Sequence, residues 1–116
     1  MTTFMKLQLI YASSSRYPNS SDLSGWCPPL GLLSIATKLL EANDINIEVY
    51  DSQIQSKEDI SDRLEGDIVG IGCGVLSYED ALYFARKSKA NGAKVILGGP
   101  YVSSIPQIIL NNQKDI

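Results

Sequence analysis

The stretch DIVGIGCGVLSYEDALYFARKSKANGAKVILG, residues 67–98, decides the fold. It begins and ends with short apolar runs, at 67–72 and 93–98, that are typical of strands covered on both faces of a sheet. The segment between them, 78–90, has the length of a helix, with a serine before it and a glycine after it. A strand, a helix and a second strand in this order predict two parallel strands joined by a right-handed crossover.

Polar residues at the ends of the predicted helices define where these helices begin and end. Ser77 and Asp80 have the spacing of a capping box before the helix at 78–90, and Gly92 is expected to end it. Ser56 is expected to cap a shorter helix in the same way. These signals agree with the apolar periodicity between them.

The same alternation of strands and helices continues on both sides of this central stretch. The further elements predicted from apolar periodicity are strands at 6–12 and 46–51 and helices at 28–43, 56–64 and 104–112. Pro29 suits the first turn of the helix at 28–43, and Pro106 suits the first turn of the last one. The buried face of the helix at 28–43 is expected to hold Leu32, Leu33, Ala36, Leu39 and Leu40.

The resulting order, βαβαβαβα, predicts an α/β protein built on a doubly wound parallel sheet with helices on both faces. Four strands are visible, and a fifth would be expected to follow the helix at 104–112. We therefore expect residues 1–116 to form one domain that lacks its closing strand and is the N-terminal fragment of a longer protein.

Composition excludes several classes of function. The 116 residues carry a net charge of -3, so a basic surface for nucleic acid is not expected. There is no histidine, which excludes Ser-His-Asp catalysis and histidine-ligated zinc, and Cys27 and Cys73 alone cannot hold a structural zinc ion. No apolar run approaches the ~20 residues that span a membrane, and no signal peptide is recognisable. A reduced, cytoplasmic protein is expected.

Three loops are expected at the carboxyl edge of the sheet, where doubly wound proteins bind their ligands. They are 13–27, which is long and rich in serine, and the two glycine-rich loops 72–77 and 98–104. Glycine there allows the backbone to approach a ligand closely, although the same residues could simply form tight turns. Ser77 and Ser104 also lie at predicted helix starts, where free N–H groups gather.

Several known motifs do not fit. The run 70–75 (GIGCGV) has the wrong sixth residue for a dinucleotide fingerprint and follows the third strand, not the first. Asp51 ends the second strand, where it could bind a ribose, but without that fingerprint we interpret it as a strand-end cap. Cys73 could be a reactive thiol, but without a histidine partner a structural thiol is favoured.

Two motifs at a characteristic separation resemble a known family. The segment 28–40 (PPLGLLSIATKLL) resembles the first helix of the N-terminal cobalamin-binding domain of cobalamin-dependent radical SAM enzymes. The segment 95–101 (VILGGPY) is similar to the family's glycine-rich fourth strand, with Tyr101 where histidine is frequent. The run 67–72 and the helix after it also match, so the resemblance covers almost the whole chain.

The resemblance implies a flavodoxin-like, Rossmann-like three-layer domain that binds cobalamin (B12) with its nucleotide tail drawn away from the cobalt. The loops after the first, third and fourth strands and the start of the first helix would line the cofactor. The implied cofactor-binding residues are Ser14, Ser15, Pro29, Leu30, Gly31, Cys73, Gly74, Val75, Leu76, Ser77, Gly98, Gly99, Pro100 and Tyr101. A bulky residue at Gly99 is expected to abolish corrinoid binding and to leave the fold intact.

The chain departs from related B12 domains in two ways. It has no histidine to bind cobalt, which agrees with the radical SAM branch and implies a base-off corrinoid without a protein ligand. It also lacks the Cys-x-x-x-Cys-x-x-Cys motif, so S-adenosylmethionine and a [4Fe-4S] cluster would belong to a C-terminal radical SAM domain of a longer chain. That domain and the corrinoid are the expected partners, and no catalytic residue or metal ligand is expected in this chain itself.

Two other functions fit the same residues. The domain could be a degenerate B12-like module that serves as an interaction or substrate-access domain. It could also be a small flavodoxin-like FMN binder, in which the serine run at 13–15 holds the phosphate.

Overall fold

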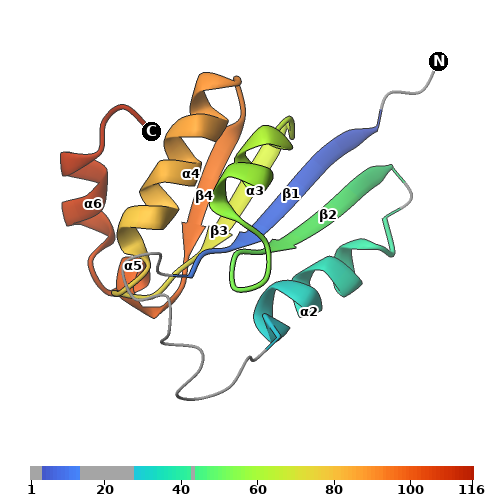
Figure 1. The fold of residues 1–116 in the computed structure, drawn as a ribbon, viewed down its shortest axis with the longest axis horizontal. Helices are drawn as coiled ribbons and strands as arrows, with labels where there is room; N and C mark the ends of the chain where they lie inside the picture. Colours follow the sequence, from blue (N-terminus) through green and yellow to red (C-terminus); the bar gives the residue numbers. More distant parts are fainter. Residues whose placement is uncertain (1–3, 14–27, 43) are drawn as a thin grey trace.

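The computed structural model describes residues 4–13, 28–42 and 44–116 and contains a parallel sheet flanked by helices (Figure 1). The strands are β1 (Met5–Tyr11), β2 (Ile45–Asp51), β3 (Ile68–Gly72) and β4 (Lys94–Gly98). The helices are α2 (Leu30–Leu39), α3 (Lys57–Asp62), α4 (Tyr78–Ala90), α5 (Pro100–Ser104) and α6 (Pro106–Asn112). Within these residues, none of the helices combines the length and the apolarity needed to cross a membrane.

The four strands are all parallel and lie in the order β2-β1-β3-β4. The chain moves from β1 outward to β2, and then crosses back to place β3 on the other side of β1. This reversal between β1 and β3 is the switch point at which doubly wound sheets bind ligands. The predicted class, an α/β fold of the flavodoxin-like, Rossmann-like type, is confirmed.

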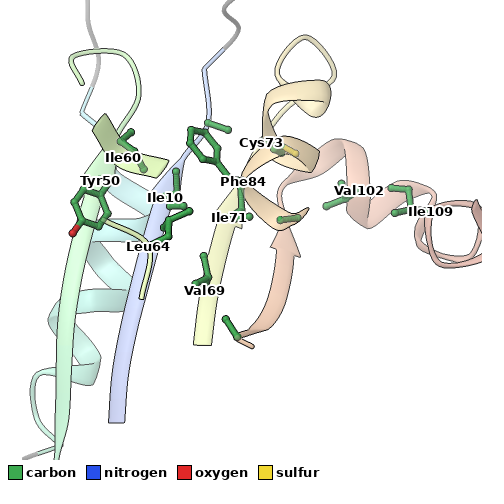
Figure 2. Close-up of a cluster of buried hydrophobic side chains, with 14 residues drawn as sticks. Ile10, Tyr50, Ile60, Leu64, Val69, Ile71, Cys73, Phe84, Val102 and Ile109 are labelled. Carbon is green, nitrogen blue, oxygen red and sulfur yellow. The ribbon is translucent and has the colours of Figure 1, made fainter. Parts of the chain in front are cut away.

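The larger core lies on the sheet face that α3 and α4 cover (Figure 2). Ile10 of β1 and Ile71 of β3 meet Phe84 of α4 and Ile60 of α3, and each of the four is at most 2% exposed. Val102 of α5 extends this cluster past β4. Each fully buried aliphatic or aromatic side chain contributes about 1.5–3 kcal/mol, so this face supplies most of the stabilising burial.

The opposite face carries a smaller core that α2 forms with β1 and β2. Leu7 and Leu9 of β1 are buried against Ala36, and Leu32 and Leu39 pack around them. The buried face of α2 is narrower than predicted, because Leu33 and Leu40 are exposed. The helix also begins later than predicted, at Leu30, with Pro29 in the N-cap position.

The capping box predicted for α4 is wrong, although the helix bounds are confirmed. The Ser77 hydroxyl does not cap the helix; it accepts a hydrogen bond from the Gly74 N–H at 3.0 Å. The Asp80 carboxylate accepts a hydrogen bond from the Lys57 ammonium on α3 at 3.0 Å, and this ion pair links the two helices. The cap predicted for α3 is confirmed, because the Ser56 hydroxyl accepts a hydrogen bond from the Asp59 N–H at 3.1 Å.

The segment after β4 also differs from the prediction. Residues 98–104 do not form a loop, because the short helix α5 starts at Pro100. The helix predicted at 104–112 is present as α6, which begins two residues later, at Pro106. The two helices meet at Ile105, whose backbone has φ -135° and ψ 46°. Pro106 disfavours the helical conformation at the residue before it, so one helix ends there and another begins.

Candidate functional site

A groove of about 630 Å³ lies on the α2 side of the sheet, above β3 and β4 and next to α2. It reaches the carboxyl ends of β3 and β4, and Pro100, the first residue of α5, also lines it. Its lining residues are Leu7, Leu9, Tyr11, Pro28, Pro29, Leu30, Gly31, Leu32, Ile35, Leu39, Gly70, Ile71, Gly72, Cys73, Gly74, Ile96, Gly98, Gly99 and Pro100. No titratable side chain other than Tyr11 and Cys73 is among them, so the groove is apolar.

Glycine makes the floor of this groove. Val69 and Ile71 point into the α4 core, so Gly70 and Gly72 face the groove by the two-residue period of a strand. Gly98 takes the corresponding position on β4, beside Gly72 in the sheet register. A Cβ at Gly98 would meet nothing within 4 Å, and one at Gly72 would reach only Leu32, at 3.8 Å. A flat ligand could therefore lie directly on the backbone at this end of the sheet.

Apolar side chains form the wall of the groove and remain uncovered. Leu30 and Ile35 of α2 are 65% and 49% exposed, and Ile96 of β4 is 60% exposed. All three line the groove. Exposed apolar groups around one concave surface are typical of a binding site for an apolar ligand or partner.

Gly99, between β4 and α5, lies against the loop that follows β3. Its φ is +115°, and a Cβ there would lie 2.2 Å from the Cys73 carbonyl oxygen. Since this Cβ would strike backbone, the expectation that a bulky residue at Gly99 leaves the fold intact is wrong. Gly98, and not Gly99, is the position at which a side chain would fill the groove.

The loop after β3 turns its apolar residues outward at the rim. Val75 and Leu76 are 64% and 60% exposed, and neither lines the groove. Ser77 is buried, and its hydroxyl is engaged by the Gly74 N–H. Tyr101 is half-buried and makes an edge-to-face contact with Tyr78, with 5.2 Å between ring centroids.

Cys73 contributes backbone, and not its thiol, to the groove. The side chain is buried in the α4 core near Phe84 and Val102 (Figure 2), and burial raises the pKa of the thiol. A thiol that stays protonated is a poor nucleophile, which supports the interpretation of Cys73 as structural. Cys27 lies outside the described residues.

The structure brings together part of the predicted site. Pro29, Leu30 and Gly31 at the start of α2 line the same groove as Cys73, Gly74, Gly98, Gly99 and Pro100. Ser14 and Ser15 lie outside the described residues. Val75, Leu76, Ser77 and Tyr101 lie at the carboxyl end of the sheet but do not line the groove.

Eleven of the groove residues are absent from the predicted site, namely Leu7, Leu9, Tyr11, Pro28, Leu32, Leu39, Ile71, Gly72, Ile35, Gly70 and Ile96. The signal for the last two was present: on each strand they alternate with residues expected in the core, so they had to face the other side. Ile35 is not one of the residues predicted for the buried face of the helix at 28–43, so the sequence pattern placed it on the exposed side of that helix.

Asp51 caps the end of β2 with its side chain. Its carboxylate accepts hydrogen bonds from the Gln53 backbone N–H at 2.9 Å and from the Gln53 side-chain amide at 3.1 Å. This agrees with the sequence interpretation of Asp51. Within the described residues, no three His, Cys, Asp or Glu side chains gather so that they could hold a metal ion.

The fold and groove define a class: an α/β domain with a parallel sheet and a glycine-floored apolar groove at the switch-point end. No protein-family model, curated protein or solved structure matches this chain.

Proposed function

We propose that this chain is a cobalamin-binding module and that the groove between α2 and the β3–β4 floor receives the nucleotide tail of the corrinoid. The observation that carries the proposal is the bare backbone at Gly72 and Gly98, at the carboxyl end of two adjacent strands. The sequence resemblance at 28–40 and 95–101 points to the same class of ligand, and both segments line the groove.

The groove fits a nucleotide tail in size and chemistry. Its volume of about 630 Å³ lies within the ~300–1,000 Å³ typical of small-molecule pockets. A planar aromatic base buries its faces well against backbone and aliphatic side chains, which are supplied here by Gly98, Leu32 and Ile96.

The residues at the mouth would bound the corrin ring. Pro29, Leu30 and Gly31 lie at one side of the mouth, and Gly74 and Pro100 lie at the other. Because the chain has no histidine, the lower face of cobalt would receive no protein imidazole, and the corrinoid would be held base-off. When bound, cobalamin supplies methyl-transfer chemistry, and this chain's residues supply burial and orientation.

The proposal includes a partner and a compartment. The partner is a radical SAM domain with methyltransferase-like activity, which would carry S-adenosylmethionine and the [4Fe-4S] cluster in a longer chain. The compartment is the reducing cytoplasm, which suits a chain with two cysteines and a buried free thiol at Cys73.

The first test is retention of hydroxocobalamin. The purified chain is incubated with it under reducing, anaerobic conditions and desalted, and the visible spectrum is recorded. We expect a retained corrinoid with a base-off spectrum. Gly98→Val should reduce retention at least tenfold, because its side chain enters open groove space. Its fold should persist, since valine suits a strand better than glycine does.

Lys94→Val is the matched control, because Lys94 lies on the same strand and the same face but outside the groove lining. It should retain corrinoid like the unchanged chain, and circular dichroism should show both variants folded. No retention by the folded, unchanged chain would contradict the proposal. Equal retention by Gly98→Val would show that the groove is not the site.

A second function, an interaction or substrate-access domain, is favoured by the outward-facing Val75 and Leu76. If the folded chain retained no corrinoid, this interaction function would become the better-supported proposal. Yellow colour on purification would instead support the FMN alternative.

A further inference from the structure

The groove has an outer row of residues at the carboxyl ends of three strands. In the sheet register this row consists of Tyr11, Gly72 and Gly98, and all three line the groove. Leu7 and Leu9 of β1 face α2, so Tyr11 faces the same side by the two-residue period of a strand. The Tyr11 hydroxyl therefore gives the outer part of the groove a group that can bond to a polar ligand atom.

The inner part of the groove is aliphatic. It consists of the lining residues behind the outer row, namely Leu7, Leu9, Ile35, Leu39, Gly70 and Ile96. Leu9, Gly70 and Ile96 form the next row of the sheet, about 6.6 Å behind the first. The helix of a parallel crossover runs antiparallel to its strands, so Ile35 and Leu39 lie behind Leu32, which is near Gly72. Among the described residues, the inner part presents no side chain that donates or accepts a hydrogen bond.

The backbone around the inner part is engaged in the sheet. Gly70 pairs with Leu9 on one side and with Ile96 on the other. The Gly98 carbonyl accepts a hydrogen bond from the Cys73 N–H, so Gly98 directs its backbone groups toward β3. In a parallel ladder residues two apart point the same way, so the backbone of Ile96 also bonds toward β3. A ligand edge in the inner part would therefore lose its water without gaining a hydrogen bond from these strands.

We propose that the groove selects corrinoids by the base of the nucleotide tail, and that it takes an apolar ring and discriminates against adenine. This inference rests on the proposed function, because it requires the tail to enter the groove. The ribose and phosphate lie in the outer part, near the Tyr11 hydroxyl, and the base lies in the inner part.

The chemistry of the two bases gives the reason. Dimethylbenzimidazole, the base of cobalamin, has its free ring nitrogen next to the ribose and two methyl groups at its far edge. Adenine has ring nitrogens and an amine on the six-membered ring that would enter the inner part. Each polar group buried there without a partner lowers the affinity by about tenfold or more. The methyl groups instead gain from contact with the aliphatic side chains.

Three corrinoids that differ only in this base test the selectivity. The purified chain is titrated with hydroxocobalamin and with its analogues that carry adenine or p-cresol in place of dimethylbenzimidazole, and the bound fraction is read from the visible spectrum after desalting. We expect cobalamin and the cresol analogue to bind with similar affinity, since neither has polar groups at the far edge of the ring. The adenine analogue should bind more weakly by about tenfold or more.

A variant tests where the base lies. Ile96→Gln adds an amide to the inner row, and a glutamine amide can pair with the amine and a ring nitrogen of adenine. It should narrow the preference for cobalamin over the adenine analogue by about fivefold, the effect of one net hydrogen bond. Ile96 is 60% exposed, so the fold should persist. Leu40→Gln is the matched control, because Leu40 is 65% exposed and lies outside the groove lining, and it should leave the preference unchanged.

The outcomes separate this inference from the proposed function. Equal affinity for all three corrinoids would overturn the selectivity and leave cobalamin binding in place. A preference for cobalamin that Ile96→Gln does not narrow, in a variant that circular dichroism shows to be folded, would also overturn it. Retention of none of the three by the folded, unchanged chain would contradict the proposed function itself.

Discussion

At the scale of single residues, two adjacent glycines at the end of β4 have different roles. Gly98 has ordinary backbone angles and free space where a Cβ would be, so its lack of a side chain keeps the groove open. Gly99 has φ +115° and lies against the Cys73 carbonyl, so its lack of a side chain lets the start of α5 approach the loop after β3. One glycine therefore serves binding, and the other serves the fold.

This difference predicts opposite effects of the same substitution. Gly99→Ala should lower the free energy of unfolding by about 2 kcal/mol or more, from positive-φ strain and the clash with Cys73. Gly98→Ala should leave it unchanged or raise it by up to about 1 kcal/mol, since alanine loses less backbone freedom. Urea unfolding followed by circular dichroism measures both. Equal effects of the two substitutions would contradict this account.

At the scale of elements, Gln8 ties β1 to its neighbours inside the protein. Its side-chain amide donates to the Glu48 carboxylate on β2 and to the Arg63 carbonyl, each at 2.8 Å. Its oxygen accepts from the Glu65 and Gly66 N–H groups. The bond from Gln8 is the main reason that the pKa of Glu48 is lowered. A single buried amide thus fixes the turn between α3 and β3 against the sheet.

Removing this amide should destabilise the chain strongly. Gln8→Leu keeps a similar size but leaves two N–H groups without their acceptor, and we expect a loss of about 2–4 kcal/mol in the free energy of unfolding. Gln107→Leu, at an exposed position on α6, should change it by less than about 0.5 kcal/mol. Thermal and urea unfolding measure both variants. A loss below about 1 kcal/mol for Gln8→Leu would show that water replaces the amide.

At the scale of the whole molecule, the two faces of the sheet are covered unequally. The face under α3 and α4 is closed by a continuous core, with α5 and α6 extending it past β4. The opposite face has α2 over β1 and β2 and the open groove over β3 and β4. The proposed site is thus an uncovered part of the sheet, next to a helix that leaves apolar side chains exposed.

Strand order also predicts where the backbone is most protected. Among the described residues, strands β1 and β3 are bonded on both sides, whereas β2 is bonded only to β1. Amides of β1 and β3 should exchange hydrogen at least tenfold more slowly than those of β2. Amide exchange read by nuclear magnetic resonance measures this. If the β2 amides exchanged as slowly as the β1 amides, the outer edge of β2 would be covered in solution.

The sequence predicted the strands, the helix α4 and the parallel architecture because these depend on local periodicity and on the order of elements. It failed where one residue could satisfy two roles. Ser77 looked like a helix cap, but its hydroxyl accepts a hydrogen bond from the Gly74 N–H instead. Pro106 lies in the first turn of α6, as predicted, but the short helix α5 before it was not predicted.

For this protein, the sequence by itself determined the class of fold and the end of the sheet at which glycine gathers. Only the tertiary structure decided which glycine faces the groove and that the Cys73 thiol lies in the core. The physical reason is that periodicity acts over a few neighbouring residues. The direction of a side chain at a strand end depends instead on contacts between segments far apart in the chain.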